Sequence, residues 1–264
     1  MKTMRGGAGS DTFRVRGGAE PTLLLGGDGV DTAVIDWASK TAAVSSYPAY
    51  GPMSRGPAWV QAADSDRIEY ADLLTATEYR QIEKLQMRSG SGDDVLWGGA
   101  AVNEIDAGGG NDRVYGSVGA DLLKGGDGDD FLAGDYWWWA GGDDRLFGER
   151  GRDTLMGDLG DDLLDGGRDD DLLIGGGGND TLVGGHGRDV AAFAGNRADY
   201  EVRADGRGGF TVVDLVGTDG ADRLSGVETL RFADGDLDVV GANPGAARPG
   251  RVGSLQASFD DWLF

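Results

Sequence analysis

Aspartate recurs along this chain in a fixed register with glycine, and the pattern could bind metal ions. Residues 89–192 divide into eleven nine-residue blocks, such as GGDGDDFLA (125–133), one of which is interrupted by extra residues, and three more blocks occupy 6–14, 17–25 and 26–34. The sixth position is aspartate in twelve of these fourteen blocks, and the exceptions are Thr22 and Asn103. The twelve are Asp11, Asp31, Asp94, Asp112, Asp121, Asp130, Asp144, Asp153, Asp162, Asp171, Asp180 and Asp189. Carboxylates are the ligands that hard cations such as Ca²⁺ prefer.

Each block is typical of a six-residue turn followed by a three-residue strand. Glycines allow the tight turn, and strand alternation directs the apolar eighth side chain inward. This position is filled by Leu96, Ile105, Val114, Leu123, Leu132, Leu146, Leu155, Leu164, Leu173 and Leu182. Two blocks form one coil, so the strands alternate between two parallel sheets. The period therefore predicts an all-β fold, a parallel β-roll (β-solenoid) with β-rich capping segments.

Such a roll needs more than its apolar residues. One buried leucine contributes roughly 1.5–3 kcal/mol, whereas ordering nine backbone residues costs about 1–2 kcal/mol each. Stacking also brings sixth-position aspartates of every second block onto one edge, where their charges repel. Calcium meets this demand with six to eight oxygen ligands. Zinc and copper lack their usual ligands, because the chain has no cysteine and one histidine.

The blocks GGDGDDFLA and GGGGNDTLV resemble the GGxGxDxUx nonapeptides of the RTX (repeats-in-toxin) family of calcium-binding, secreted bacterial proteins. The resemblance implies calcium ions between same-side turns, held by sixth-position carboxylates and by carbonyls of the glycine-rich turn. It pairs Asp94 with Asp112, Asp112 with Asp130, Asp130 with Asp153, Asp153 with Asp171, Asp171 with Asp189, Asp121 with Asp144, Asp144 with Asp162, and Asp162 with Asp180. About eight ions or more are expected, and Asn103 with Asp121 is a weaker pair.

The same resemblance implies ligands in the glycine-rich turns. They are expected at Gly108, Gly125, Gly126, Asp127, Gly148, Gly166, Gly175, Gly176 and Gly184. A glycine ligand does not apply at position 107, because the block AGGGNDRVY (107–115) begins with Ala107.

The repeats divide the chain into five segments. We expect a short N-terminal roll (1–36), a β-rich or mixed insert or cap (37–88), the main roll (89–192), a C-terminal β cap (193–240), and a linker with a secretion signal (241–264). The stretch ADLLTATEYRQIEK (71–84) could instead form a short helix. Residues 193–238 look like the β-rich segment that closes many RTX rolls.

One turn of the main roll carries an insertion, DYWWWA (135–140). Its aromatic residues Trp137, Trp138 and Trp139 either pack over the roll edge or form an exposed stacking surface for sugar rings or another partner. Replacing all three by alanine separates the two interpretations. Lost folding supports packing, and lost glycan binding with intact folding supports recognition.

The end of the chain suggests an export route. Asp261 precedes the terminal residues Trp262, Leu263 and Phe264, and this arrangement resembles the uncleaved C-terminal signal of type I secretion substrates. The start, MKTMRGGAGS, has no apolar core typical of a cleaved signal peptide, and no run approaches a membrane span. The resemblance thus implies an extracellular protein of a Gram-negative bacterium, exported by a type I apparatus. An alternative is the calcium-binding and secretion region of a larger hydrolase or epimerase.

Several classes of function are disfavoured. A formal charge of -22 and a pI near 4.2 disfavour nucleic acid and anionic lipid as partners. His186 is the single histidine, so HExxH is absent, and neither GxSxG nor GxxxxGK[ST] occurs. We therefore expect a binding protein rather than an enzyme.

Overall fold

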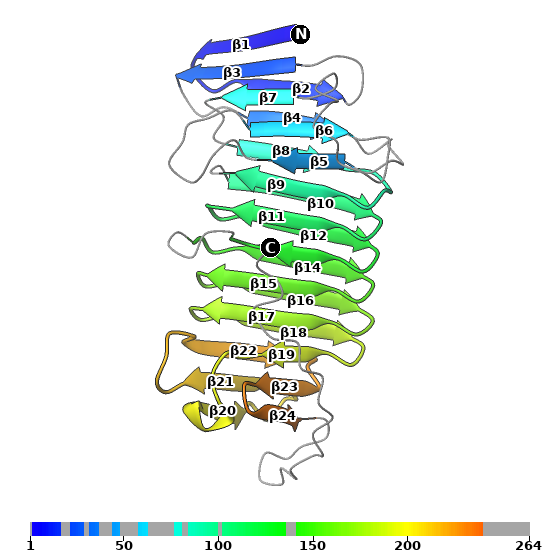
Figure 1. Cartoon of the computed structure of the whole chain (residues 1–264). Coiled ribbons are helices and arrows are strands. Elements are labelled where there is room, and N and C mark those ends of the chain that lie inside the picture. The colour runs from blue at the N-terminus through cyan, green and yellow to red at the C-terminus, as the bar shows by residue number, and fades with distance from the viewer. Residues whose placement is uncertain are drawn as a thin grey trace.

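The chain forms one elongated stack of strands in two long sheets (Figure 1). The computed structural model describes residues 2–16, 22–28, 32–36, 44–47, 58–62, 77–80, 84–99, 102–135 and 141–239. The 13-stranded sheet follows the order β1 (Lys2–Ala8), β3 (Thr22–Asp28), β7 (Thr77–Arg80), β6 (Ala58–Ala62), β5 (Val44–Tyr47), β9 (Val95–Gly99), β11 (Arg113–Ser117), β13 (Phe131–Ala133), β15 (Thr154–Leu159), β17 (Leu172–Gly177), β19 (Val190–Ala192), β23 (Thr229–Phe232) and β24 (Gly235–Asp238). The 11-stranded sheet follows the order β2 (Thr12–Arg16), β4 (Thr32–Asp36), β8 (Lys84–Arg88), β10 (Val102–Gly109), β12 (Leu122–Asp127), β14 (Arg145–Arg150), β16 (Leu163–Arg168), β18 (Thr181–His186), β22 (Ala221–Ser225), β21 (Phe210–Asp214) and β20 (Tyr200–Ala204).

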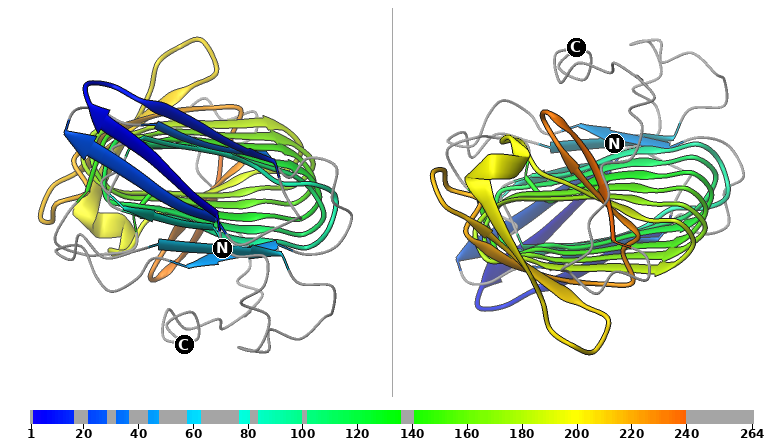
Figure 2. Two further views of the ribbon diagram at one scale, coloured as in Figure 1. Left: turned by 90° about the horizontal axis from the view of Figure 1, so that it is seen from above. Right: turned by 90° about the horizontal axis from the view of Figure 1, so that it is seen from below.

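Consecutive strands of the main roll alternate between the two sheets, and each pairs in parallel with the strand two ahead. Leu155 of β15 lies opposite Leu173 of β17, and Leu146 of β14 lies opposite Leu164 of β16. Seen along its axis, the roll is a flattened coil (Figure 2). The prediction of a parallel β-roll is confirmed.

The eighth-position side chains form the core between the sheets, as predicted. Every one from Leu96 to Leu182 is buried with no exposed surface, and Ala191 continues the file. Toward the N-terminus the core continues through Phe13, Ala33 and Leu85. A single file of apolar residues makes the core narrow, so the turns at its edges must carry much of the stability.

The N-terminal blocks join the main roll without a break in the 11-stranded sheet. The strand β8 pairs in parallel with β4 on one side and with β10 on the other, with Leu85 opposite both Ala33 and Asn103. In the other sheet, β5 and β6 pair antiparallel, as do β6 and β7. The strand β7 falls within the stretch for which a helix was the alternative. Among the described residues the only helix is one 3-10 turn, Arg197–Asp199.

Antiparallel strands close the C-terminal end of the stack. The strands β20 and β21 form a hairpin, β21 pairs antiparallel with β22, and β23 pairs antiparallel with β24. Two cap strands also continue the roll itself, because β22 pairs in parallel with β18 and β23 with β19. The cap is therefore built onto the last coil and covers the end of its core.

Four turn residues that are not glycine adopt a left-handed backbone. They are Ser117, Glu149, Asp158 and Asp169, with φ of 86°, 77°, 71° and 73°. The first three occupy the second position of their blocks and Asp169 occupies the fourth, where most blocks have glycine. A side chain in this region costs roughly 1–2 kcal/mol relative to its ordinary backbone.

The substitution Asp169→Gly is expected to stabilise the calcium-loaded roll by about 1 kcal/mol, because it relieves this strain. Asp170→Gly is the matched control. It removes the same charge, but it discards the 2.8 Å hydrogen bond that Asp170 accepts from the Arg188 amide, and it should destabilise the roll. Denaturant unfolding at saturating calcium measures both. Equal effects of the two changes would contradict the strain argument.

Candidate metal centre

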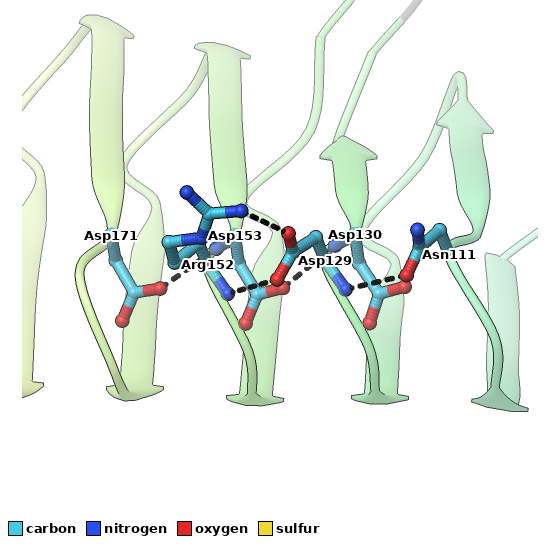
Figure 3. Close-up of polar contacts among 6 residues, drawn as sticks. All are labelled: Asn111, Asp129, Asp130, Arg152, Asp153 and Asp171. Atoms are coloured by element: carbon cyan, nitrogen blue, oxygen red, sulfur yellow. Dashed lines mark hydrogen bonds and ion pairs between the residues drawn. The ribbon is translucent and has the colours of Figure 1, made fainter.

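The sixth-position aspartates stack into two columns, one along each edge of the roll. In each column, Oδ1 of one aspartate accepts a hydrogen bond from the backbone amide of the aspartate one coil earlier. Figure 3 shows Asp130, Asp153 and Asp171 in such a column. All eight pairs implied by the family resemblance lie together in this way, with N···O distances of 2.7–2.9 Å. The ninth pair also forms, because the Asn103 amide donates to Asp121 at 2.7 Å.

In nine of these residues the second carboxylate oxygen has no hydrogen-bond partner, whereas Oδ2 of Asp94 accepts the Ser89 hydroxyl. Buried, unpartnered Oδ2 atoms belong to Asp112, Asp121, Asp130, Asp144, Asp153, Asp162, Asp171, Asp180 and Asp189. These nine residues are at most 3% exposed. A buried charged oxygen without a partner is costly unless a cation satisfies it. The columns therefore fit a set of bound cations.

A backbone carbonyl faces the same space as each of several Oδ2 atoms. A Cβ added at Gly148 would lie 2.3 Å from Oδ2 of Asp153 and 2.5 Å from the carbonyl oxygen of Gly166, in the next coil. The same arrangement recurs at Gly157, beside Asp162 and the carbonyl of Gly175. A side chain at either glycine would collide with both oxygens, and the oxygens that converge there are of the kind calcium binds.

The remaining candidate turn residues fall into three groups. Five glycines hold the first position of a block, next to the carboxylate of the same block: Gly125, Gly148, Gly166, Gly175 and Gly184. Three glycines hold the second position and have positive φ: Gly108, Gly126 and Gly176. A Cβ at Gly126 would lie 2.0 Å from the carbonyl oxygen of Gly108 one coil away. The side chain of Asp127 is exposed and pairs with Arg150 at 2.9 Å, and its carbonyl accepts the Gly110 amide at 2.9 Å.

Position 107 departs from the glycine pattern, as the sequence already indicated, and it offers no glycine ligand. The residue is Ala107, the first of its block, and it is fully buried as part of the core cluster. Oδ2 of Asp112, in the same block, is unpartnered like the others. A methyl group at the first position supplies no polar partner, and the column continues past this block without a change in its hydrogen bonds.

The other predicted site residues are only partly covered by the structure. Asp11 is half-buried, and its carbonyl accepts the amide of Thr32 at 2.9 Å. Asp31, the aromatic residues Trp137–Trp139 and the terminal residues Asp261–Phe264 lie outside the described residues. Their roles remain predictions.

A second, exposed ladder runs beside one buried column (Figure 3). At the fifth position of blocks in successive coils, Asp129 donates its amide to Asn111 at 2.9 Å, and the Arg152 amide and guanidinium both donate to Asp129, at 2.9 and 2.7 Å. These side chains satisfy one another and face solvent. The exposed ladder therefore sets the register of the coils without a metal ion.

Burial makes the column carboxylates hard to ionise. Desolvation, opposed by the backbone hydrogen bond and reinforced by neighbouring aspartates, raises the pKa of Asp144 to about 9 and that of Asp112 to about 8. The same causes raise the pKa of Asp130 and of Asp153 to about 7. A positive charge is needed to keep these groups ionised at neutral pH.

Both columns continue into the cap, which the block pattern alone did not reveal. Oδ1 of Asp222 accepts the Asp180 amide at 2.9 Å, and Oε2 of Glu228 accepts the Asp189 amide at 2.8 Å. Asp222 belongs to GTDGADRLS (217–225), which matches the block pattern at Gly220, Asp222 and Leu224. That match was the available signal, but a hairpin separates it from the other blocks. Glu228 follows a shortened turn and has no such signal.

Comparison with known proteins agrees with this geometry. The family model of the RTX calcium-binding nonapeptide repeat matches four times, at residues 87–114, 106–135, 140–173 and 157–191. Residues 87–191 are RTX calcium-binding repeats. No curated protein matches the chain. The RTX segment coincides with the columns from Asp94 to Asp189, so the aspartates with unpartnered Oδ2 atoms are those of the calcium-binding repeats.

The chemistry of the RTX turns is that of carboxylate pairs completed by backbone oxygens. Across the described ranges, no three acidic or histidine side chains gather into a group that could hold a metal. Two column carboxylates and the carbonyls of the turn supply the hard oxygen donors that calcium accepts. In the same part of the chain, no helix is both long and apolar enough to cross a membrane.

The raised pKa values predict that acid partly replaces calcium. For an aspartate whose pKa rises from 3.8 to about 7 or about 9 on folding, the metal-free fold is favoured at low pH and loses stability as pH rises through that range. In chelator, circular dichroism should therefore show more β structure at pH 5 than at pH 8. Identical spectra at the two pH values would mean that the buried carboxylates do not oppose folding.

Proposed function

We propose that this chain is a secreted protein whose RTX roll folds when it binds calcium outside the cell. The observation that carries the proposal is the set of nine buried aspartates with an unpartnered Oδ2 atom. Because a column of ionised carboxylates repels itself, the metal-free roll is unstable at neutral pH. Calcium binding supplies the missing charge, so the free energy of binding becomes free energy of folding.

Neighbouring aspartates of a column bind each ion together. Each inner member, such as Asp153, lies between two neighbouring aspartates of its column. It therefore borders two intervals, that is, the two spaces between successive aspartates, and each interval can hold a cation. Each interval also contains turn carbonyls such as that of Gly166. The calcium affinity of such a site depends on the charge of its ligands and on its rigidity. A site that is loosely ordered without the ion binds weakly, and extracellular calcium-binding modules fill at roughly 10⁻⁴–10⁻³ M calcium. A cytosol with far less calcium would leave the chain extended.

The proposal includes export through a type I apparatus, with Asp261 and the terminal residues Trp262, Leu263 and Phe264 as the signal. Support comes from the sequence pattern of these residues behind a calcium-binding repeat segment. The proposal gives this chain a binding role and no catalytic one.

Deletion of residues 261–264 tests the export step. In a host with a type I apparatus, the shortened chain should remain inside the cell, while a chain that lacks four residues of the linker 241–253 should reach the medium. Secretion of both chains at equal levels would contradict the proposed signal. Calcium-dependent folding is measured separately on purified chains, so the two parts of the proposal can fail independently.

A further inference from the structure

A second kind of carboxylate is that of Asp135, the first residue of the stretch DYWWWA (135–140). Asp135 holds the second position of its block, where Ser117, Glu149 and Asp158 of other blocks have positive φ. The φ of Asp135 is not positive. Its backbone therefore departs from that of Ser117, Glu149 and Asp158, and its side chain is enclosed, with 2% of the residue exposed.

Both carboxylate oxygens of Asp135 are buried without a hydrogen-bond partner. This distinguishes it from the column aspartates, in which Oδ1 accepts a backbone amide and only Oδ2 lacks a partner. The amides of Gly142 and Leu159 are near enough to act on its charge, but neither completes a hydrogen bond to it. A fully buried carboxylate in this state requires a ligand or a proton.

The groups around Asp135 add negative charge rather than neutralise it. Asp158 and Asp162, both in the next coil, act on Asp135 by charge repulsion, and Asp135 acts in the same way on Asp121 and Asp144. Two oxygens also converge beside it. A Cβ added at Gly141 would lie 2.7 Å from Oδ2 of Asp135 and 2.1 Å from the carbonyl oxygen of Leu159.

We propose that Asp135 and the carbonyl oxygen of Leu159 bind one calcium ion in a site separate from the two sixth-position columns. The donors are hard oxygens, and backbone carbonyls complete the shell because the described part of the chain gathers no third acidic ligand there. This ion joins residue 135 to the next coil directly beside residue 141, so it ties the two ends of the insertion to the roll.

Ion counting on the purified chain tests the site. In Asp135→Asn, elemental analysis after dialysis against calcium should find one ion fewer per chain than in the wild type. Asp143→Asn is the matched control, because it removes the same charge from the same turn at an exposed position that accepts the Asp161 amide at 3.1 Å. It should keep the wild-type count. An unchanged count in Asp135→Asn would overturn the proposal.

Crystals of the wild-type chain grown with calcium keep the proposal testable if Asp135→Asn does not fold. Anomalous density beside Asp135 and Leu159 is the expected result. Density in the columns but not beside Asp135 would overturn this inference and leave the proposed function intact. Absence of ions from both places would overturn both.

Discussion

Chelation of calcium is expected to convert the roll into an extended chain with little β structure. Nine buried aspartates would each keep an oxygen without a partner, and their charges would repel along both columns. The apolar file is too narrow to compensate, because each block contributes only one large apolar side chain to the core. Circular dichroism should lose its β signal, and the radius of gyration measured by X-ray scattering should increase from about 20 Å toward about 55 Å.

The return of calcium should restore both signals, and the transition should be cooperative, because each inner column aspartate borders two sites. Magnesium at the same concentration is the control. It prefers rigid octahedra and keeps its waters, so it should restore little structure. A β spectrum that survives chelation at neutral pH would contradict calcium-coupled folding.

The nine-residue period was sufficient to predict the parallel roll, its core and the pairing of its aspartates. Leu155 and Leu173 are opposite each other because their blocks are one coil apart, and Asp153 and Asp171 follow from the same spacing. A solenoid makes this inference reliable, since each coil contacts only its neighbours and sequence distance sets spatial distance.

Prediction from sequence reached its limit where the period is broken. Asp222 lies 42 residues after Asp180, because the hairpin of β20 and β21 intervenes, and only the fold brings the two together. The pairing of β4 with β8 likewise joins the N-terminal blocks to the main roll across a long insertion. Asp135 was counted with the insertion, and no block spacing indicated that its side chain is buried.

The exposed ladder explains why fifth-position and sixth-position aspartates differ in importance despite being adjacent. Asp129 is 44% exposed in its side chain and is already satisfied by Arg152, whereas Asp130 is 3% exposed and keeps an unpartnered oxygen. An exposed ion pair contributes roughly 0–1 kcal/mol. A buried carboxylate that holds a cation contributes through the whole free energy of binding.

The substitution Asp153→Asn is therefore expected to raise the calcium concentration needed for folding and to lower stability at fixed calcium. Asp153 accepts the Asp130 amide and donates its own amide to Asp171, so its carboxylate borders two sites. A site filled at about a hundred times its dissociation constant contributes about 2.7 kcal/mol, and weakening two sites could cost up to about 5 kcal/mol. Asparagine keeps the shape and the hydrogen-bond acceptor but removes the charge.

The adjacent change Asp129→Asn serves as the control, because it removes one negative charge from the same edge of the roll without touching a buried oxygen. Calcium titrations followed by circular dichroism should give a higher folding midpoint for Asp153→Asn and a midpoint close to the wild type for Asp129→Asn. If both changes lower the midpoint equally, the columns act only through general charge repulsion. If Asp153→Asn alone raises it, the buried carboxylate is a calcium ligand, and its position between two neighbours explains why one substitution weakens two sites.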